Sequence, residues 1–184
     1  ARFGVNVNKA GDINADGCQD VAVGDEYVDS YTGDVLIFFG PVAPQTQTDA
    51  AADLSYTGLT ASGHIGRSVE PAGDLDGDGY DDFAISTPYD YYDGALTSIT
   101  YLYRGGPQLQ GDHDVDEADW ILTGAAGWGG GVGDVNGDGE VDVLTGSDSG
   151  TGVAYLFLGP LPTGVYSTYD DADVSELARI WTVS

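Results

Sequence analysis

The sequence predicts an all-β protein built from one unit repeated three times, and two observations lead to this expectation. An Asp- and Gly-rich stretch of nine residues occurs at 12–20, 74–82 and 134–142, so the starts lie 62 (74 − 12) and 60 (134 − 74) residues apart. Short apolar runs follow each copy at similar distances. Gly, with 29 residues, and Asp favour tight turns, and a fixed period indicates an array of supersecondary units.

Each unit contains four candidate strands of mostly β-branched and aromatic residues, the first of them leading into the Asp-rich loop. The segments are 2–7, 21–24, 35–40 and 54–58 in the first unit, 64–69, 83–86, 99–105 and 120–124 in the second, and 128–132, 143–146, 153–159 and 180–183 in the third. Four strands per repeat is the number in a β-propeller blade. We therefore expect three four-stranded antiparallel blades over residues 1–60, 61–124 and 125–184, with solvent loops at 41–52, 105–118 and 159–176.

The loop of the second unit has the composition of a cation site. Asp74, Asp76, Asp78 and Asp82 occupy loop positions 1, 3, 5 and 9, with glycines at positions 4 and 6. Two unit charges about 4 Å apart repel by roughly 4 kcal/mol at an effective dielectric near 20, so carboxylates that converge need a counter-ion. Oxygen ligands on a flexible loop favour Ca²⁺ over a transition metal.

An EF-hand is the obvious alternative for such a loop, and it requires Glu at loop position 12. That position holds Val23, Ile85 and Thr145 in the three repeats, each inside a predicted strand. The EF-hand is therefore rejected, and the Asp at position 9 is expected to close the site instead. Acidic turns without a metal are the remaining alternative, against which the threefold recurrence of the same polar positions argues.

These features resemble the FG-GAP repeat, the blade unit of integrin α-subunit propellers and of many bacterial secreted proteins. The resemblance rests on Phe3-Gly4, on the Gly-Asp-x-Asx-x-Asp-Gly loops and on the apolar strand after each loop, and it covers essentially the whole chain. Phe-Gly becomes Ile65-Gly66 in the second repeat and Gly-Gly in the third. The resemblance implies that each loop joins the first two strands of a blade.

The resemblance also implies three Ca²⁺ sites, one per blade, with side-chain ligands at loop positions 1, 3, 5 and 9 and a main-chain carbonyl ligand at position 7. The implied ligand residues are Asp12, Asn14, Asp16, Cys18 and Asp20 in the first loop, Asp74, Asp76, Asp78, Tyr80 and Asp82 in the second, and Asp134, Asn136, Asp138, Glu140 and Asp142 in the third. The second set has four carboxylates where the others have three and an Asn, so we expect the second loop to bind Ca²⁺ most tightly.

Three blades are too few for a closed propeller, which has four to eight; integrin-type propellers, by the resemblance, have seven. Uncovered blade faces and strand edges favour association. The sequence thus predicts either further blades in a longer chain or assembly of copies, as a closed homo-oligomer or as a filament.

Charge and composition exclude several classes of binding partner and location. The formal net charge of −26 argues against nucleic acid and anionic membrane surfaces, and no apolar run is long enough to span a membrane. Cys18 is the only cysteine, so an intrachain disulfide is excluded, and a free thiol, an intermolecular link and a small buried hydrophobe remain open.

No nucleophile signature is present, and the chain is predicted not to be an enzyme. The tyrosines of the connection 89–94 and the isolated Trp128 are candidates for ligand contact or for packing. The leading hypothesis is an extracellular, calcium-stabilised module for adhesion or self-assembly, with a protein or glycan ligand at the cell surface or matrix. The alternatives are a lectin-like module and an accessory domain of a secreted hydrolase or lyase.

Overall fold

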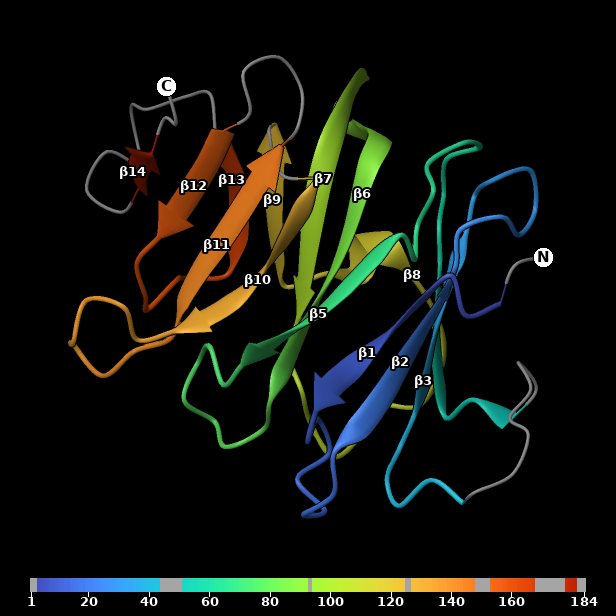
Figure 1. Ribbon diagram of the computed structural model, residues 1–184, viewed down its shortest axis with the longest axis horizontal. Coiled ribbons are helices and arrows are strands. Elements are labelled where there is room, and N and C mark those ends of the chain that lie inside the picture. The colour runs from blue at the N-terminus through green and yellow to red at the C-terminus, as the bar shows by residue number, and fades with distance from the viewer. Residues whose placement is uncertain are drawn as a thin grey trace.

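The computed structural model describes residues 3–43, 51–92, 94–124, 127–147, 153–167 and 178–181. The chain forms three sheets that stand side by side (Figure 1). Each sheet contains four antiparallel strands, which confirms the all-β architecture of propeller blades. In the part of the chain that the structure describes, no helix has the length and apolar character needed to cross a membrane.

In the first sheet, antiparallel strands pair in chain order: β1 (Asn6–Gly11), β2 (Asp20–Asp25), β3 (Asp34–Phe38) and β4 (Leu54–Thr57). Ala22 pairs with Ile37, and the neighbouring pair Val23 and Leu36 faces the opposite side of the sheet. Both faces of the central strands are therefore apolar. This explains why the sequence shows continuous apolar runs here and not a strict alternation of apolar and polar residues.

The other two sheets repeat this arrangement. The second consists of β5 (Ser68–Gly73), β6 (Asp82–Tyr92), β7 (Ala95–Tyr103) and β9 (Trp120–Gly124), and the third of β10 (Trp128–Gly133), β11 (Asp142–Ser147), β12 (Val153–Phe157) and β14 (Ala178–Trp181). In every sheet the register shifts just before the Asp-rich loop, at Lys9/Gly11, Pro71/Gly73 and Gly131/Gly133. Such a bulge bends the first strand into the loop.

The strand register corrects one part of the repeat alignment. Trp128 occupies the register position of Asn6 and Ser68. Counting back from it, Ala125-Ala126 corresponds to Phe3-Gly4, so the expected Gly-Gly equivalence is wrong. A run of glycines fits several alignments, but counting back nine residues from Asp12, Asp74 and Asp134 selects the same alignment as the strand register. Ala125 and Ala126 lie outside the described residues.

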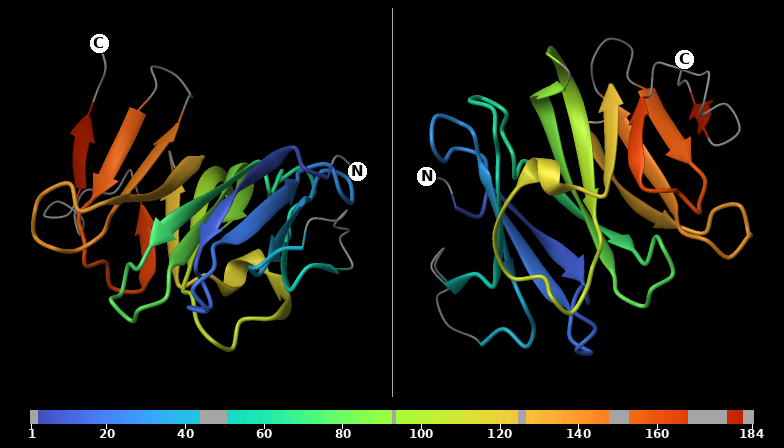
Figure 2. Two further views of the ribbon diagram at one scale, coloured as in Figure 1. Left: turned by 60° about the horizontal axis from the view of Figure 1, so that its bottom comes forward. Right: turned by 180° about the vertical axis from the view of Figure 1, so that it is seen from behind.

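Two connections that were expected to be solvent loops contain strands instead. β8 (Gly111–Asp114) pairs in parallel with β4, and β13 (Gly164–Ser167) pairs in parallel with β9. In Figure 2 the yellow segment that carries β8 reaches from the second sheet to the blue first sheet. The loop prediction is wrong at these positions because the outer strand of a blade has unpaired N–H and C=O groups that a further strand can satisfy.

Side chains reinforce the pairing of β8 with the first sheet. The Ser55 hydroxyl donates to the Asp112 carboxylate at 2.7 Å, and the His113 ring stacks on Tyr56 with centroids 5.4 Å apart. After β8 comes the short 3₁₀ helix η2 (Val115–Glu117). The carbonyl of Val115 accepts a buried hydrogen bond from the Tyr103 hydroxyl. A segment within the predicted second blade thus completes the sheet of the first.

Two apolar layers hold the sheets together, one between the first and second sheets and one between the second and third. In the first layer, Phe83 stacks on Tyr103 with centroids 5.1 Å apart, and Tyr56 packs against both rings. The second layer contains Trp120, which is fully buried and donates its Nε1–H to the Leu161 carbonyl at 2.9 Å. The second blade is therefore covered on both faces.

The tyrosine-rich connection of the second blade is also more regular than expected. Residues 89–92 belong to β6, which forms a long hairpin with β7 after an irregularity between Thr87 and Asp90. Tyr89 and Tyr91 are exposed, whereas Asp90 is buried and accepts the hydroxyl of Tyr101 at 2.9 Å. The loop prediction missed this strand because pairing with β7 overrides the turn-like composition.

Candidate metal centre

The three Asp-rich loops share one pattern of hydrogen bonds. In the first loop, the two carboxylate oxygens of Asp12 accept the N–H groups of Asp16 at 3.0 Å and Gly17 at 2.9 Å. The equivalent bonds run from Asp78 and Gly79 to Asp74, and from Asp138 and Gly139 to Asp134. The carboxylate at position 1 therefore closes each loop into a compact turn. In the third loop these backbone donors, Gly139 foremost, lower the pKa of Asp134.

The backbone conformation explains why loop position 6 is always glycine. Gly17, Gly79 and Gly139 have φ values of 90°, 94° and 96°, a region that disfavours side chains. Position 4 also has positive φ, and there Ala15 adopts 54° where the other two loops have glycine. The backbone path thus explains why glycine recurs at position 6 of all three loops.

In the second loop, three predicted ligands converge. Asp74, Asp76 and Asp78 each bring one carboxylate oxygen within 4.8 Å of the others. At this separation each pair of charges repels by roughly 3 to 4 kcal/mol at an effective dielectric near 20. Arg104 offsets part of this repulsion, since its Nε lies 3.0 Å from Asp76 Oδ2. The donor set consists of oxygen atoms alone, which fits Ca²⁺.

The first and third loops contain Asn at position 3, and its amide has two contacts. Asn136 Oδ1 accepts the N–H of Asp138 at 2.8 Å, while its Nδ2 donates to Asp138 Oδ2 at 2.7 Å. Asn14 makes the same pair of contacts with Asp16, at 3.0 and 3.3 Å. The amide thus neutralises none of the charge but holds the carboxylate at position 5 in place.

The Asp at position 9 lies deeper than the other predicted ligands. Asp20, Asp82 and Asp142 have no exposed surface, and each accepts two backbone N–H groups. One donor is position 2 of the same loop and the other is the glycine after the third strand. The bonds are Ile13 and Gly40 to Asp20 at 2.9 and 2.8 Å, Leu75 and Gly105 to Asp82 at 2.7 and 2.8 Å, and Val135 and Gly159 to Asp142 at 2.8 and 2.9 Å.

Burial has a clear electrostatic effect on this position. Desolvation raises the pKa of Asp82 to about 7, against the lowering effect of the Gly105 and Leu75 donors and with a further contribution from the charges of Asp76 and Asp78. Desolvation likewise raises the pKa of Asp20. A cation in the loop would favour the ionised form of these carboxylates.

The glycines after the third strands belong to the structural framework of the loops, and the sequence reasoning did not single them out. A side chain on Gly105 would lie 2.4 Å from the Asp81 carbonyl oxygen and 2.7 Å from Tyr80 Cβ. Gly40 and Gly159 are restricted in the same way by loop positions 7 and 8 of their own blades. The signal was present in the sequence, because each third-strand run ends in Gly at the same point.

Position 7 contributes its backbone to the loop. The N–H groups of Cys18, Tyr80 and Glu140 donate to the carboxylate at position 5, at 2.8, 2.9 and 2.9 Å. Cys18 is a free, half-buried thiol whose Cβ lies near Gly40. Desolvation, followed by the charge of Asp16, raises the pKa of this thiol.

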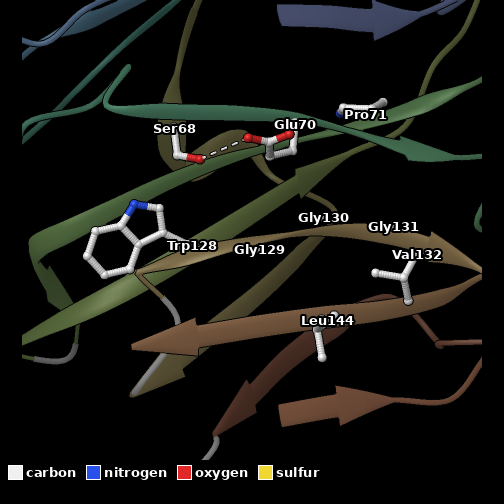
Figure 3. A pocket seen from close by; sticks show the side chains of 9 residues that line it. All are labelled: Ser68, Glu70, Pro71, Trp128, Gly129, Gly130, Gly131, Val132 and Leu144. Carbon is white, nitrogen blue, oxygen red and sulfur yellow. Dashed lines mark hydrogen bonds between the residues drawn. The ribbon is translucent and has the colours of Figure 1, made fainter. Parts of the chain in front are cut away.

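A shallow hollow between β5 and β10 is lined by Trp128, which the sequence suggested as a candidate for ligand contact or for packing. Figure 3 shows Trp128 beside the glycines 129–131, with Ser68 and Glu70 on the facing strand. Arg67 lies over the Trp128 ring, 5.5 Å from its centroid. A side chain on Gly131 would lie 1.9 Å from the Ala72 carbonyl oxygen, so close packing of two strands explains this glycine.

Blades of four antiparallel strands, with an acidic loop between the first two strands of each, define a propeller-type repeat domain. Residues 66–99 match the family model of the FG-GAP repeat. This stretch contains β5, the second Asp-rich loop and most of the β6–β7 hairpin.

Integrin α chains are among the curated relatives. The chain is 34% identical over 113 residues to integrin alpha-PS3 of Drosophila melanogaster, covering 60% of this chain and 9% of the relative. It is 34% identical over 99 residues to integrin alpha-IIb of Homo sapiens, covering 50% and 9%. Phosphatidylinositol-glycan-specific phospholipase D of Rattus norvegicus is 29% identical over 119 residues, covering 61% and 14%.

The chain thus spans about a tenth of the length of these integrin relatives. The family match and the integrin likenesses support an FG-GAP, integrin-like repeat domain, which confirms the resemblance found in the sequence.

Proposed function

We propose that the chain is a calcium-stabilised, non-catalytic module of an extracellular adhesion-type protein. The convergence of Asp74, Asp76 and Asp78 in the second loop carries the calcium part of this proposal. The integrin relatives support the adhesion-type role and the extracellular location. The partner would be a protein or glycan at the cell surface or matrix.

Each loop would hold one Ca²⁺ through the residues named above at positions 1, 3, 5, 7 and 9, and the bound ion would neutralise carboxylates that otherwise repel. The position-9 carboxylate links this charge balance to the fold. Asp82 joins the second loop to the end of β7 through Leu75 and Gly105, so an ion that favours ionised Asp82 would strengthen both bonds. Calcium would then stabilise the attachment of the first two strands to the third.

Calcium titration by calorimetry and thermal melting test the proposal. We expect three bound ions, and a loop saturated at a hundred times its dissociation constant contributes about 2.7 kcal/mol. For a chain of this size that corresponds to roughly 5 to 11 °C per site. Asp78→Ala should remove one ion and leave two. An equal melting temperature in calcium and in excess EDTA would contradict the calcium role.

Two alternative functions have specific support. The phospholipase D relative favours an accessory domain attached to a secreted hydrolase. An aromatic group formed by Tyr27, Tyr31, His64 and Tyr89, with centroid separations of 5.3 to 6.3 Å between the contacting rings, favours a lectin-like role. A glycan array probed with wild type and with Tyr89→Ala tests the lectin-like role. A lectin should bind glycans as wild type and lose this signal in the variant.

A further inference from the structure

The first and second Asp-rich loops are joined by direct hydrogen bonds. The three loops follow β1, β5 and β10 on the same side of the sheets (Figure 1). Asp81, at position 8 of the second loop, accepts the N–H of Asp12 on its carboxylate at 2.9 Å, and its own N–H donates to the Asp12 carbonyl at 3.2 Å. Both residues are half-buried. Asp81 therefore binds both backbone polar groups of Asp12.

The end of the third strand of the second blade adds another link between these two loops. Gly105 donates its N–H to Asp82 in the second loop at 2.8 Å, and the next residue, Gly106, donates its N–H to the Ile13 carbonyl in the first loop at 2.7 Å. A side chain on Gly105 would lie 2.4 Å from the Asp81 carbonyl oxygen and 2.8 Å from that of Ile13. Both loops are therefore packed against the same turn.

The second and third loops have a different contact. Val141 holds position 8 of the third loop and has no side-chain acceptor, and Pro160, at the corresponding position after the third strand, has no N–H. A side chain on Gly73 would lie 3.6 Å from Val141, which is ordinary van der Waals contact, whereas one on Gly11 would lie 2.6 Å from Asp81 Cβ. The described residues thus contain one hydrogen-bonded pair of loops and one pair in apolar contact.

The link joins predicted ligands of two different sites. Asp81 lies between Tyr80 at position 7 and Asp82 at position 9 of its own loop. Its partner Asp12 is a predicted ligand, and the Asp12 carboxylate accepts two N–H groups of the first loop. An ion that fixes the backbone of either loop would therefore fix one side of the hydrogen bonds to the other. The second ion would then bind a loop that has less conformational freedom left to lose.

We propose that Asp81 couples the first and second loops, so that they bind Ca²⁺ cooperatively while the third loop binds its ion independently. This inference rests on the proposed calcium binding and adds an interaction between two of the sites. The coupling is reciprocal, because each ion must change the affinity for the other by the same factor. Coupling between sites typically changes affinity by about 5- to 150-fold, and a few half-buried hydrogen bonds place this pair near the lower end.

Calcium titration followed by peptide-resolved hydrogen–deuterium exchange measures the midpoint of each loop separately. Asp16→Ala, Asp78→Ala and Asp138→Ala are matched variants, because each removes the exposed predicted ligand at position 5 of one loop. Asp78→Ala should move the midpoint of the first loop about fivefold toward higher calcium, and Asp16→Ala should move that of the second loop equally. Asp138→Ala should move neither, and the midpoint of the third loop should be the same in Asp16→Ala, Asp78→Ala and wild type.

Substitutions of Asp81 test whether this residue carries the coupling. Asp81→Val copies the third loop and removes the acceptor, so the midpoint of the first loop should become the same with and without Asp78→Ala. Asp81→Asn keeps an oxygen acceptor for the Asp12 N–H and should retain part of the coupling. In EDTA, Asp81→Val should speed exchange in the first loop, whereas Val141→Ala should leave exchange in the second loop unchanged. Circular dichroism checks that each variant keeps its strand content.

Three results overturn the proposal. They are a first-loop midpoint that does not move in Asp78→Ala, a coupling that persists in Asp81→Val, and a third loop that responds as strongly as the first. The first comparison needs no substitution of Asp81, so it stands even where the Asp81 variants fold poorly. Three bound ions with independent midpoints would refute the coupling and leave the proposed function intact, whereas a chain that binds no calcium would refute both.

Discussion

Replacement of Asp82 by Ala in calcium-free buffer separates the structural role of position 9 from metal binding. The Asp82 carboxylate is fully buried and accepts the N–H of Leu75 at 2.7 Å and of Gly105 at 2.8 Å. Ala removes both acceptors and leaves the two donors without partners in the interior. Asp78→Ala is the matched control, since Asp78 is a predicted ligand in the same loop but is exposed and accepts the N–H of Tyr80 at the surface.

The expected loss follows from the two buried donors. A buried group left without its hydrogen bond costs about 1 to 3 kcal/mol, so Asp82→Ala should lose about 2 to 6 kcal/mol of unfolding free energy. Burial raises the pKa of Asp82 to about 7, so the carboxylate is already costly to ionise at neutral pH and the loss should fall toward the lower end. Asp78→Ala should lose less than about 1 kcal/mol in the same buffer.

Urea unfolding followed by far-ultraviolet circular dichroism in EDTA measures both losses. In excess calcium, calorimetry should show that each variant has lost the ion of the second loop. The two variants should therefore resemble each other in calcium binding and differ in metal-free stability. Equal stabilities of Asp82→Ala and Asp78→Ala in EDTA would refute the structural role assigned to position 9.

Three further predictions follow from particular contacts. Desolvation raises the pKa of Asp34, so its contribution to stability is present below pH 3.8 and is lost as the pH rises; Asp34→Asn should therefore raise the melting temperature at neutral pH. Gly105→Ala should cost about 1 to 3 kcal/mol, because the added carbon would lie 2.4 Å from the Asp81 carbonyl oxygen. Arg104→Gln should tighten calcium binding by the second loop up to roughly fivefold, because the guanidinium lies 3.0 Å from Asp76 Oδ2.

Each of these has its own check. The advantage of Asp34→Asn should vanish in melts below pH 3.8, and a gain that persists there points to a cause other than ionisation. For Gly105→Ala, urea unfolding within about 0.5 kcal/mol of wild type would show that the loop backbone moves aside freely. For Arg104→Gln, calorimetric affinities that fall or stay constant would mean that the arginine does not compete with the ion for Asp76.

Much of the candidate site could be predicted from the sequence, because its predicted ligands are close together along the chain. Asp74, Asp76 and Asp78 span five residues, and glycine at position 6 forces the turn that brings their oxygens together. What could not be predicted is the ion pair of Arg104 with Asp76, which bears on the expected order of affinities among the loops. These residues are far apart in sequence, and no local pattern indicates their contact.

The sequence by itself determined that this protein is an array of three β units with an acidic loop in each, because short apolar runs, turn residues and loop spacing are local properties. Only the tertiary structure decided that β8 and β13 complete the preceding sheets and that Asp20, Asp82 and Asp142 join each loop to a distant strand. These features depend on contacts between segments remote in sequence. Val135 and Leu75 occupy the same loop position, and only the presence of a neighbouring blade makes one exposed and the other buried.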